Sequence, residues 1–117
     1  MRLHRNLVFT TIDSLMAIFN EGEYADKVVA RALKKDKRWG SHDRKFVAET
    51  IYEIVRWKRL YTEIAEVKEP FDRDKIWRIF AVWAVLRGYT LPDWKYFEDT
   101  PVRRIKGKFD ELTKTRK

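Results

Sequence analysis

Residues 41–67 read SHDRKFVAETIYEIVRWKRLYTEIAEV, and this stretch decides the fold. Its first apolar residues recur at spacings of four, three and one, the repeat of one helix face, and lie at Val47, Ile51, Ile54 and Val55. The second half keeps a helical spacing but turns the apolar stripe sideways, through Trp57, Leu60, Ile64 and Val67. Ser41 is a suitable N-cap, and Asp43 places a negative charge where the helix dipole favours it. We therefore expect a long helix with several neighbours, bent or broken near Trp57.

The composition predicts one helical domain. The chain has 117 residues, 44% of them hydrophobic and 15% aromatic, which suffices for a single modest core. Only four glycines and three prolines are present, so helices are favoured over a turn-rich β fold. The absence of cysteine excludes a disulfide, a thiolate zinc site and a cysteine nucleophile within this chain, and it fits a cytoplasmic location. No run of ~18 apolar residues occurs, so we expect no membrane span.

Further helices are predicted on both sides of the central stretch. The spacing of apolar residues indicates helices over 7–20 and 24–35, with Tyr24 facing inward. Trp39, in the turn that follows, is expected to pack in the core because of the area that an aromatic ring can bury.

The stretch 76–87, IWRIFAVWAVLR, is apolar nearly all round, so we expect a central helix. Asp72 or Asp74 is placed to cap it, and Gly88 to end it. Aromatic residues beyond it are expected to close the core, namely Trp94, Tyr96 and Phe97. The sequence thus predicts an all-α bundle of about five to six helices around the helices 41–67 and 76–87. The bundle would occupy residues 1–99, and 100–117 would form a basic helix or linker toward a further domain.

The net charge is +8 and is concentrated in two blocks. Residues 31–45 and 102–117 each hold seven basic and two acidic residues, a net of +5, so the remainder carries −2. Such blocks favour a polyanionic partner. The alternative is that they are solvated surface, the first of them stabilising the negative end of the helix 24–35. Arg44 lies close to the apolar face of the helix 41–67, so we expect it in a buried salt bridge.

No catalytic or metal site can be assembled from the residue types present. His4 and His42 have no ligand neighbour at helical spacing, which is typical of isolated surface histidines. The glycines are isolated, so no phosphate-binding loop exists. Glu49 and Glu53 lie one helical turn apart, and we expect each to pair with a nearby cation rather than to act as a carboxylate pair.

The stretch 41–61 resembles the central signature of NusB-like RNA-binding domains. More closely, it resembles the version at the N-terminus of the RsmB/Sun (Fmu) family of ribosomal RNA cytosine-C5 methyltransferases. The matching positions are Asp43–Arg44, Phe46–Val47, Tyr52 and Val55–Arg56, followed by Trp57. The order of the expected helices fits as well, and the resemblance covers roughly residues 7–91. The chain departs from the family at Glu53, where a small residue is common.

The resemblance implies a NusB-like fold that binds structured RNA, in particular ribosomal RNA. The basic residues expected to contact RNA are Lys34, Lys35, Lys37, Arg38, Lys45, Arg56, Arg59, Arg103, Arg104, Lys106 and Lys108. The last four would extend the surface formed by the first block. Catalysis would belong to a methyltransferase domain outside this chain, which would supply a cysteine nucleophile and bind S-adenosylmethionine. That domain, or a ribosomal protein, would be the protein partner; the chain alone would be no enzyme and hold no cofactor.

Two other binding functions stay open. The bundle would dock on a protein if its exposed aromatic residues serve as anchors, for example Trp57, Trp94 or Tyr96. A free-standing DNA-binding domain is the least favoured, because no short turn joins two helices in the helix-turn-helix manner with base-reading residues on the second.

Overall fold

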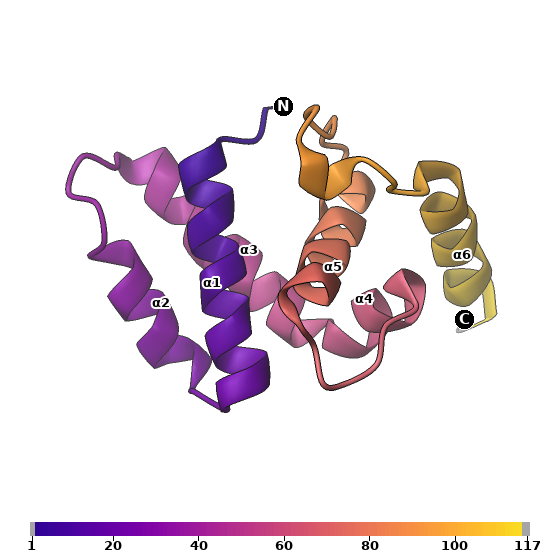
Figure 1. Cartoon of the computed structure of the whole chain (residues 1–117), viewed down its shortest axis with the longest axis horizontal. Coiled ribbons are helices and arrows are strands. Elements are labelled where there is room, and N and C mark those ends of the chain that lie inside the picture. Colours follow the sequence, from indigo (N-terminus) through magenta and orange to yellow (C-terminus); the bar gives the residue numbers. More distant parts are fainter. Residues whose placement is uncertain (1, 116–117) are drawn as a thin grey trace.

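The computed structural model describes residues 2–115, and within them the chain is all-α, with six α-helices, one short 3₁₀ turn and no strand (Figure 1). The elements in chain order are α1 (Arg5–Glu21), α2 (Ala25–Leu33), α3 (Ser41–Arg56), α4 (Lys58–Ala65), α5 (Arg73–Leu86), η1 (Lys95–Phe97) and α6 (Val102–Thr115). The predicted all-α fold and its number of helices are confirmed. No described helix is long and apolar enough to cross a membrane.

The predicted break near Trp57 is confirmed, so two helices replace the single helix over 41–67. Trp57 has φ −107° and ψ 30°, outside the helical range, and it ends α3 and precedes α4. Glu66, in the left-handed conformation with φ 59°, ends α4. The predicted N-cap is wrong by one position: Gly40 occupies it, and its backbone N–H donates to the Asp43 carboxylate at 3.3 Å.

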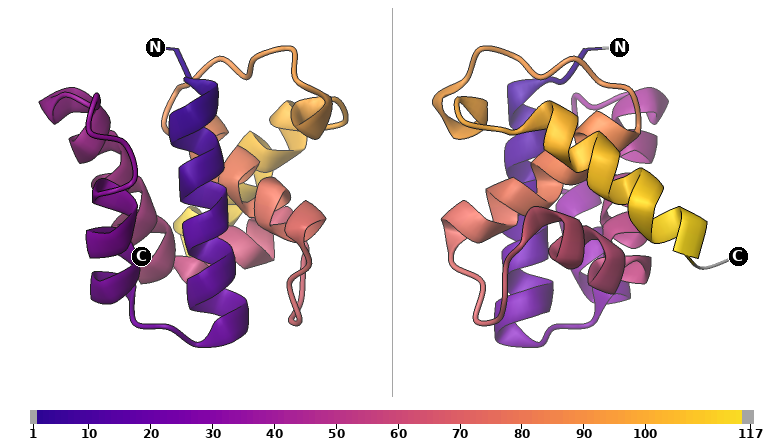
Figure 2. Two further views of the ribbon diagram at one scale, coloured as in Figure 1. Left: turned by 60° about the vertical axis from the view of Figure 1, so that its left-hand side comes forward. Right: turned by 90° about the vertical axis from the view of Figure 1, so that its right-hand side faces the viewer.

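The helices form two groups of three that meet along α5. Helices α1, α2 and α3 pack pairwise, and so do α4, α5 and α6. Helix α5 also packs on α1, and Figure 2 shows α6 lying across α4 and α5. The break at Trp57 therefore carries the chain from the first group into the second.

Helix α5 is the centre of the core, as its sequence predicts. Its ring-bearing residues Trp77, Phe80 and Trp83 are at most 3% exposed. Rings from α1 and α3 contact them edge-on, with centroids 5.5 Å apart for Phe9 and Trp77 and 5.8 Å for Phe46 and Trp83. Of the two predicted caps, Asp72 acts, accepting from the Lys75 backbone N–H at 2.9 Å. Gly88 follows the helix with φ 85°, a conformation that favours glycine.

Three side chains do not lie where the pattern places them. Tyr24 is 76% exposed, because it precedes α2 in extended backbone and so is not on the helix face. Arg44 is exposed and forms no buried salt bridge; its guanidinium donates instead to the Leu33 carbonyl, at 2.7 Å, at the end of α2. Helix ends leave carbonyls without intrahelical donors, which explains this choice. Tyr96 is 46% exposed, whereas Trp39 and Phe97 are buried as expected.

Candidate nucleic-acid interface

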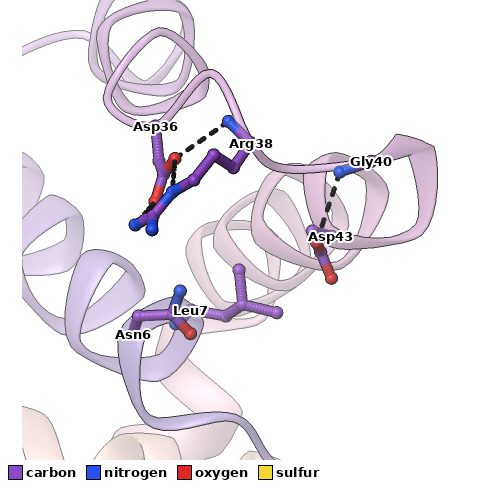
Figure 3. A network of polar contacts seen from close by, with 6 residues as sticks. All are labelled: Asn6, Leu7, Asp36, Arg38, Gly40 and Asp43. Atoms are coloured by element: carbon purple, nitrogen blue, oxygen red, sulfur yellow. Dashed lines mark hydrogen bonds and ion pairs between the residues drawn. The ribbon is translucent and has the colours of Figure 1, made fainter.

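The first basic block forms a surface at the α2–α3 connection, called here the first basic surface and made of Lys34, Lys35, Lys37, Arg38 and Lys45. Arg38 of this surface is bonded to Asp36 of the same connection. Arg38 donates from Nε and Nη2 to the Asp36 carboxylate at 3.1 and 2.9 Å, and Figure 3 shows the side chain folded back onto Asp36. These hydrogen bonds lower the pKa of Asp36 and raise the pKa of Arg38. The positive charge of Arg38 is therefore partly balanced by the negative charge of Asp36.

The lysines of the first basic surface differ in their partners. Lys35 lies 3.7 Å from the Asp13 carboxylate of α1, and Lys45 lies 4.0 Å from Glu49 one turn on. Exposed pairs at these distances contribute little and leave the lysine free to exchange partners. Lys34 and Lys37 are exposed and form no ion pair within residues 2–115. These two lysines are the first surface's most available cations.

The second basic block forms a surface on α6, called here the second basic surface and made of Arg103, Arg104, Lys106 and Lys108. Arg104 Nε and Lys108 Nζ converge on one carboxylate oxygen of Glu66, at 2.6 and 3.5 Å. The Arg104 hydrogen bond is the main cause of a lowered Glu66 pKa. Arg103 and Lys106 are exposed and have no ion-pair partner in the described part of the chain. Arg104 and Lys108 therefore attach α6 to Glu66 at the end of α4, whereas Arg103 and Lys106 face solvent.

Arg56 and Arg59 lie on either side of Trp57, at the α3–α4 break. The Arg56 guanidinium stands 5.3 Å from the centre of the Trp57 ring, and Trp57 is 46% exposed. Next to Trp57 runs a largely apolar groove between α4 and α6, lined by Leu60, Tyr61, Phe109 and Leu112 among others. The α3–α4 break therefore presents two arginines next to the exposed ring of Trp57.

The structure does not join the two basic surfaces into one. Figure 1 shows the α2–α3 connection and α6 at opposite ends of the longest axis, which extends 42 Å. The second surface therefore does not extend the first, contrary to the prediction. A count of charge along the sequence carries no information on this separation, because the two three-helix groups take the blocks to separate ends.

Two cations beside α6 were missed by sequence reasoning. Arg78 of α5 and Lys95 of η1 line a hollow together with Arg104. Nothing in the linear pattern indicates this, because the three residues belong to separate elements and only Arg104 lies within a basic block. Only the packing of η1 and α6 against α5 brings them to one place.

No catalytic arrangement is seen in the described residues. No group of three or more His, Cys, Asp or Glu side chains there is placed to hold a metal ion. Glu49 pairs with Lys45, as expected. Glu53 pairs with Arg87 at 3.4 Å and accepts from Trp83 Nε1 at 2.7 Å, so it links α3 to the end of α5. Both carboxylates therefore have cation partners, as the sequence predicts.

Comparison with known proteins gives no match: no protein-family model, no curated protein and no solved structure is similar to this chain. The class of molecule defined by the geometry is a small all-α globule that carries two separate basic surfaces. The resemblance of residues 41–61 to the NusB-like signature stays a prediction.

Proposed function

We propose that this chain is an RNA-binding helical domain whose partner is structured RNA. The observation that carries the proposal is that each basic surface keeps two exposed cations without ion-pair partners in the described residues, Lys34 and Lys37 on the first and Arg103 and Lys106 on the second. The first pair follows α2, which packs on α1 and α3, and the second pair lies in the first half of α6, which packs on α4 and α5. RNA helices are recognised mainly through shape, phosphates and 2′-hydroxyls, for which such cations are suited.

Three residues of the resemblance have structural roles at the start of α3 and between α2 and α3. Asp43 caps α3, Arg44 closes the end of α2, and the Tyr52 hydroxyl donates to Asp26 at 2.7 Å. Arg44 and Tyr52 therefore hold α3 against α2, and the proposal assigns RNA contact to the basic surfaces. We extend the proposal accordingly: the domain delivers ribosomal RNA in the cytoplasm to a cytosine-C5 methyltransferase domain outside this chain, which would bind S-adenosylmethionine.

Fluorescence anisotropy tests RNA binding directly. A labelled ribosomal RNA hairpin and a DNA duplex of equal charge are titrated at several salt concentrations. If about five phosphates are engaged, the logarithm of the association constant falls with the logarithm of salt with a slope of roughly −3 to −5. We expect the hairpin to bind more tightly than the duplex. Binding that is insensitive to salt, or a preference for DNA, would contradict the proposal.

Charge reversal then locates the contacts. The double variant Lys34→Glu/Lys37→Glu is expected to weaken RNA binding and to flatten the salt slope by about 1 for each phosphate that the variant no longer binds. Lys68→Glu is the control for charge alone, because Lys68 is exposed between α4 and α5, outside both basic surfaces. It carries one charge reversal and the double variant carries two, so a loss of binding free energy half as large in the control would show that only net charge matters.

A second candidate function is docking on a protein, such as a ribosomal protein. It is favoured by the 46% exposure of Trp57 at the mouth of the groove between α4 and α6. A large exposed aromatic beside an apolar groove is a common anchor in interfaces. Loss of partner binding in Trp57→Ala, with hairpin binding intact, would support this function, and loss of both activities would not.

A further inference from the structure

A hollow of about 370 Å³ opens between α4, α5, η1 and α6, and we call it the α6 hollow. Its volume falls within the range of about 300–1,000 Å³ that small-molecule sites occupy. It lies beside the second basic surface, because Arg104 of that surface forms part of its wall. The hollow is therefore large enough for one nucleotide and is adjacent to the cations that would hold an RNA strand.

The inner wall of the hollow suits a flat, partly apolar ring. Ala81, Val82 and Ile105 line it and are at most 3% exposed. Tyr96 forms another wall; it stacks on Trp77 with ring centroids 4.2 Å apart and planes at 8°, yet it stays 46% exposed. Tyr96 is thus a supported aromatic ring with area left for a ligand. Stacking of bases on such rings is a main source of affinity for unpaired nucleotides.

The rim of the hollow carries both the charge that a phosphate needs and the acceptor that a base needs. The Lys95 side-chain amine has no hydrogen-bond or ion-pair partner in the described residues, and Arg78 donates one N–H to the Ala65 carbonyl at 2.7 Å while its side chain remains exposed. Asp99 also lines the hollow and pairs with none of the described cations. A carboxylate only accepts hydrogen bonds, so it favours a base that carries an amino group.

We propose that the α6 hollow receives one unpaired, amino-bearing nucleotide of the RNA that the second basic surface binds. Lys95 and Arg78 contact its phosphate, the base lies against Tyr96 and the apolar wall, and Asp99 accepts from the amino group. The proposal rests on the proposed RNA-binding function and names the part of the RNA that this end of the molecule selects. A free nucleotide has the same chemistry, so the test separates the two sources.

The test compares two labelled RNAs by anisotropy with the full chain: a fully paired blunt duplex, and the same duplex with a single bulged adenosine. We expect the bulged RNA to bind at least about fivefold more tightly, the lower limit for stacking of one base. Asp99→Ala should reduce this preference, because the amino group loses its acceptor while stacking on Tyr96 remains, and binding of the paired duplex should be kept. General electrostatics predicts the opposite, since removing a negative charge would tighten binding of both RNAs.

Asp93→Ala is the matched control, because Asp93 is exposed in the loop before η1 and does not line the hollow. It should keep the bulge preference. Equal binding of bulged and paired RNA by the unaltered chain overturns this inference and leaves RNA binding intact. Binding of neither RNA overturns the proposed function and the inference with it. Saturable binding of adenosine monophosphate without any bulge preference would assign the hollow to a free nucleotide, and it would also overturn the inference.

Discussion

Glu53 shows how one side chain ties two helices together. Its carboxylate accepts from Trp83 Nε1 at 2.7 Å and faces Arg87 at 3.4 Å, and Trp83 is only 3% exposed. The family that residues 41–61 resemble often has a small residue at this position. In this chain the Glu53 carboxylate accepts a hydrogen bond from a buried indole N–H, which a small side chain at this position could not do.

Replacing Glu53 by alanine is expected to destabilise the fold by about 1–3 kcal/mol, because the buried Trp83 N–H loses its acceptor. Glu53→Gln keeps an acceptor oxygen and should cost clearly less. Urea denaturation followed by circular dichroism measures both. If alanine and glutamine cost the same, the hydrogen bond to Trp83 is not what stabilises this contact.

The burial of Tyr61 makes the stability of the fold decrease at alkaline pH. It is 5% exposed, and burial, followed by the nearby Glu53 charge, raises its pKa from 10.0 to about 12. Because the Tyr61 pKa is higher in the folded chain than in the unfolded chain, its full contribution to the free energy of unfolding is present only below about pH 10. This contribution is lost as the pH rises from about 10 through 12. The unfolded chain ionises in that window while the folded chain resists ionisation.

Tyr61→Phe removes the ionisable group, so the variant should lose less stability than the parent between about pH 10 and about pH 12, the window in which the Tyr61 contribution is lost. Urea midpoints at the two pH values give the comparison. Tyr24→Phe, at a 76% exposed position, is the control and should follow the parent. Parallel losses in all three proteins would contradict the role of Tyr61.

At the scale of the element, the helical periods identified the helices but not every orientation. The break at Trp57 was predictable because the apolar stripe rotates there. Tyr24 and Arg44 were wrongly placed because their positions depend on where α2 begins and ends, and helix ends are set by local hydrogen bonds as much as by period.

Helix α6 is held by one fully buried side chain and by the partly buried Phe109 and Leu112. Among its described side chains Ile105 alone is fully buried, at 3% exposure, and Glu66 fastens Arg104 and Lys108. Ile105→Ala is expected to release α6 from α4 and α5 while the rest of the fold stays intact. Substitutions of this kind in a rigid core lower the free energy of unfolding by about 2–5 kcal/mol. Here the loss is limited to the free energy by which α6 binds to α4 and α5, because α6 detaches once that is lost.

Limited proteolysis checks this prediction, with cleavage expected within residues 102–115 before any other site. Val102→Ala is the control, because Val102 is 38% exposed and supplies little packing. Global unfolding of Ile105→Ala, seen as loss of most helical signal, would instead show that α6 is part of the cooperative core.

At the scale of the whole molecule, the separation of the basic surfaces has a consequence for RNA length. A stem shorter than the 42 Å axis can contact only one surface at a time, whereas a longer RNA can contact both. The effects of distant substitutions on binding free energy should then add for the long RNA.

We therefore expect Lys34→Glu/Lys37→Glu and Arg103→Glu/Lys106→Glu to weaken binding of a long RNA by free energies that sum in the combined variant. On a short stem, the two double variants should weaken binding by different amounts, and one of them should have little effect. Anisotropy titrations with stems of two lengths measure this. Equal effects on short and long stems would mean that the RNA does not span the molecule.

The sequence by itself determined the helical class, the central place of α5 and the break at Trp57, because each follows from residues close together in the chain. The same holds for the two basic blocks, which are counts along the sequence. Only the tertiary structure decided that the blocks lie at opposite ends and that Arg78, Lys95 and Arg104 surround one hollow. Those relations depend on how two groups of three helices pack on α5, and contacts between distant segments leave no period in the sequence.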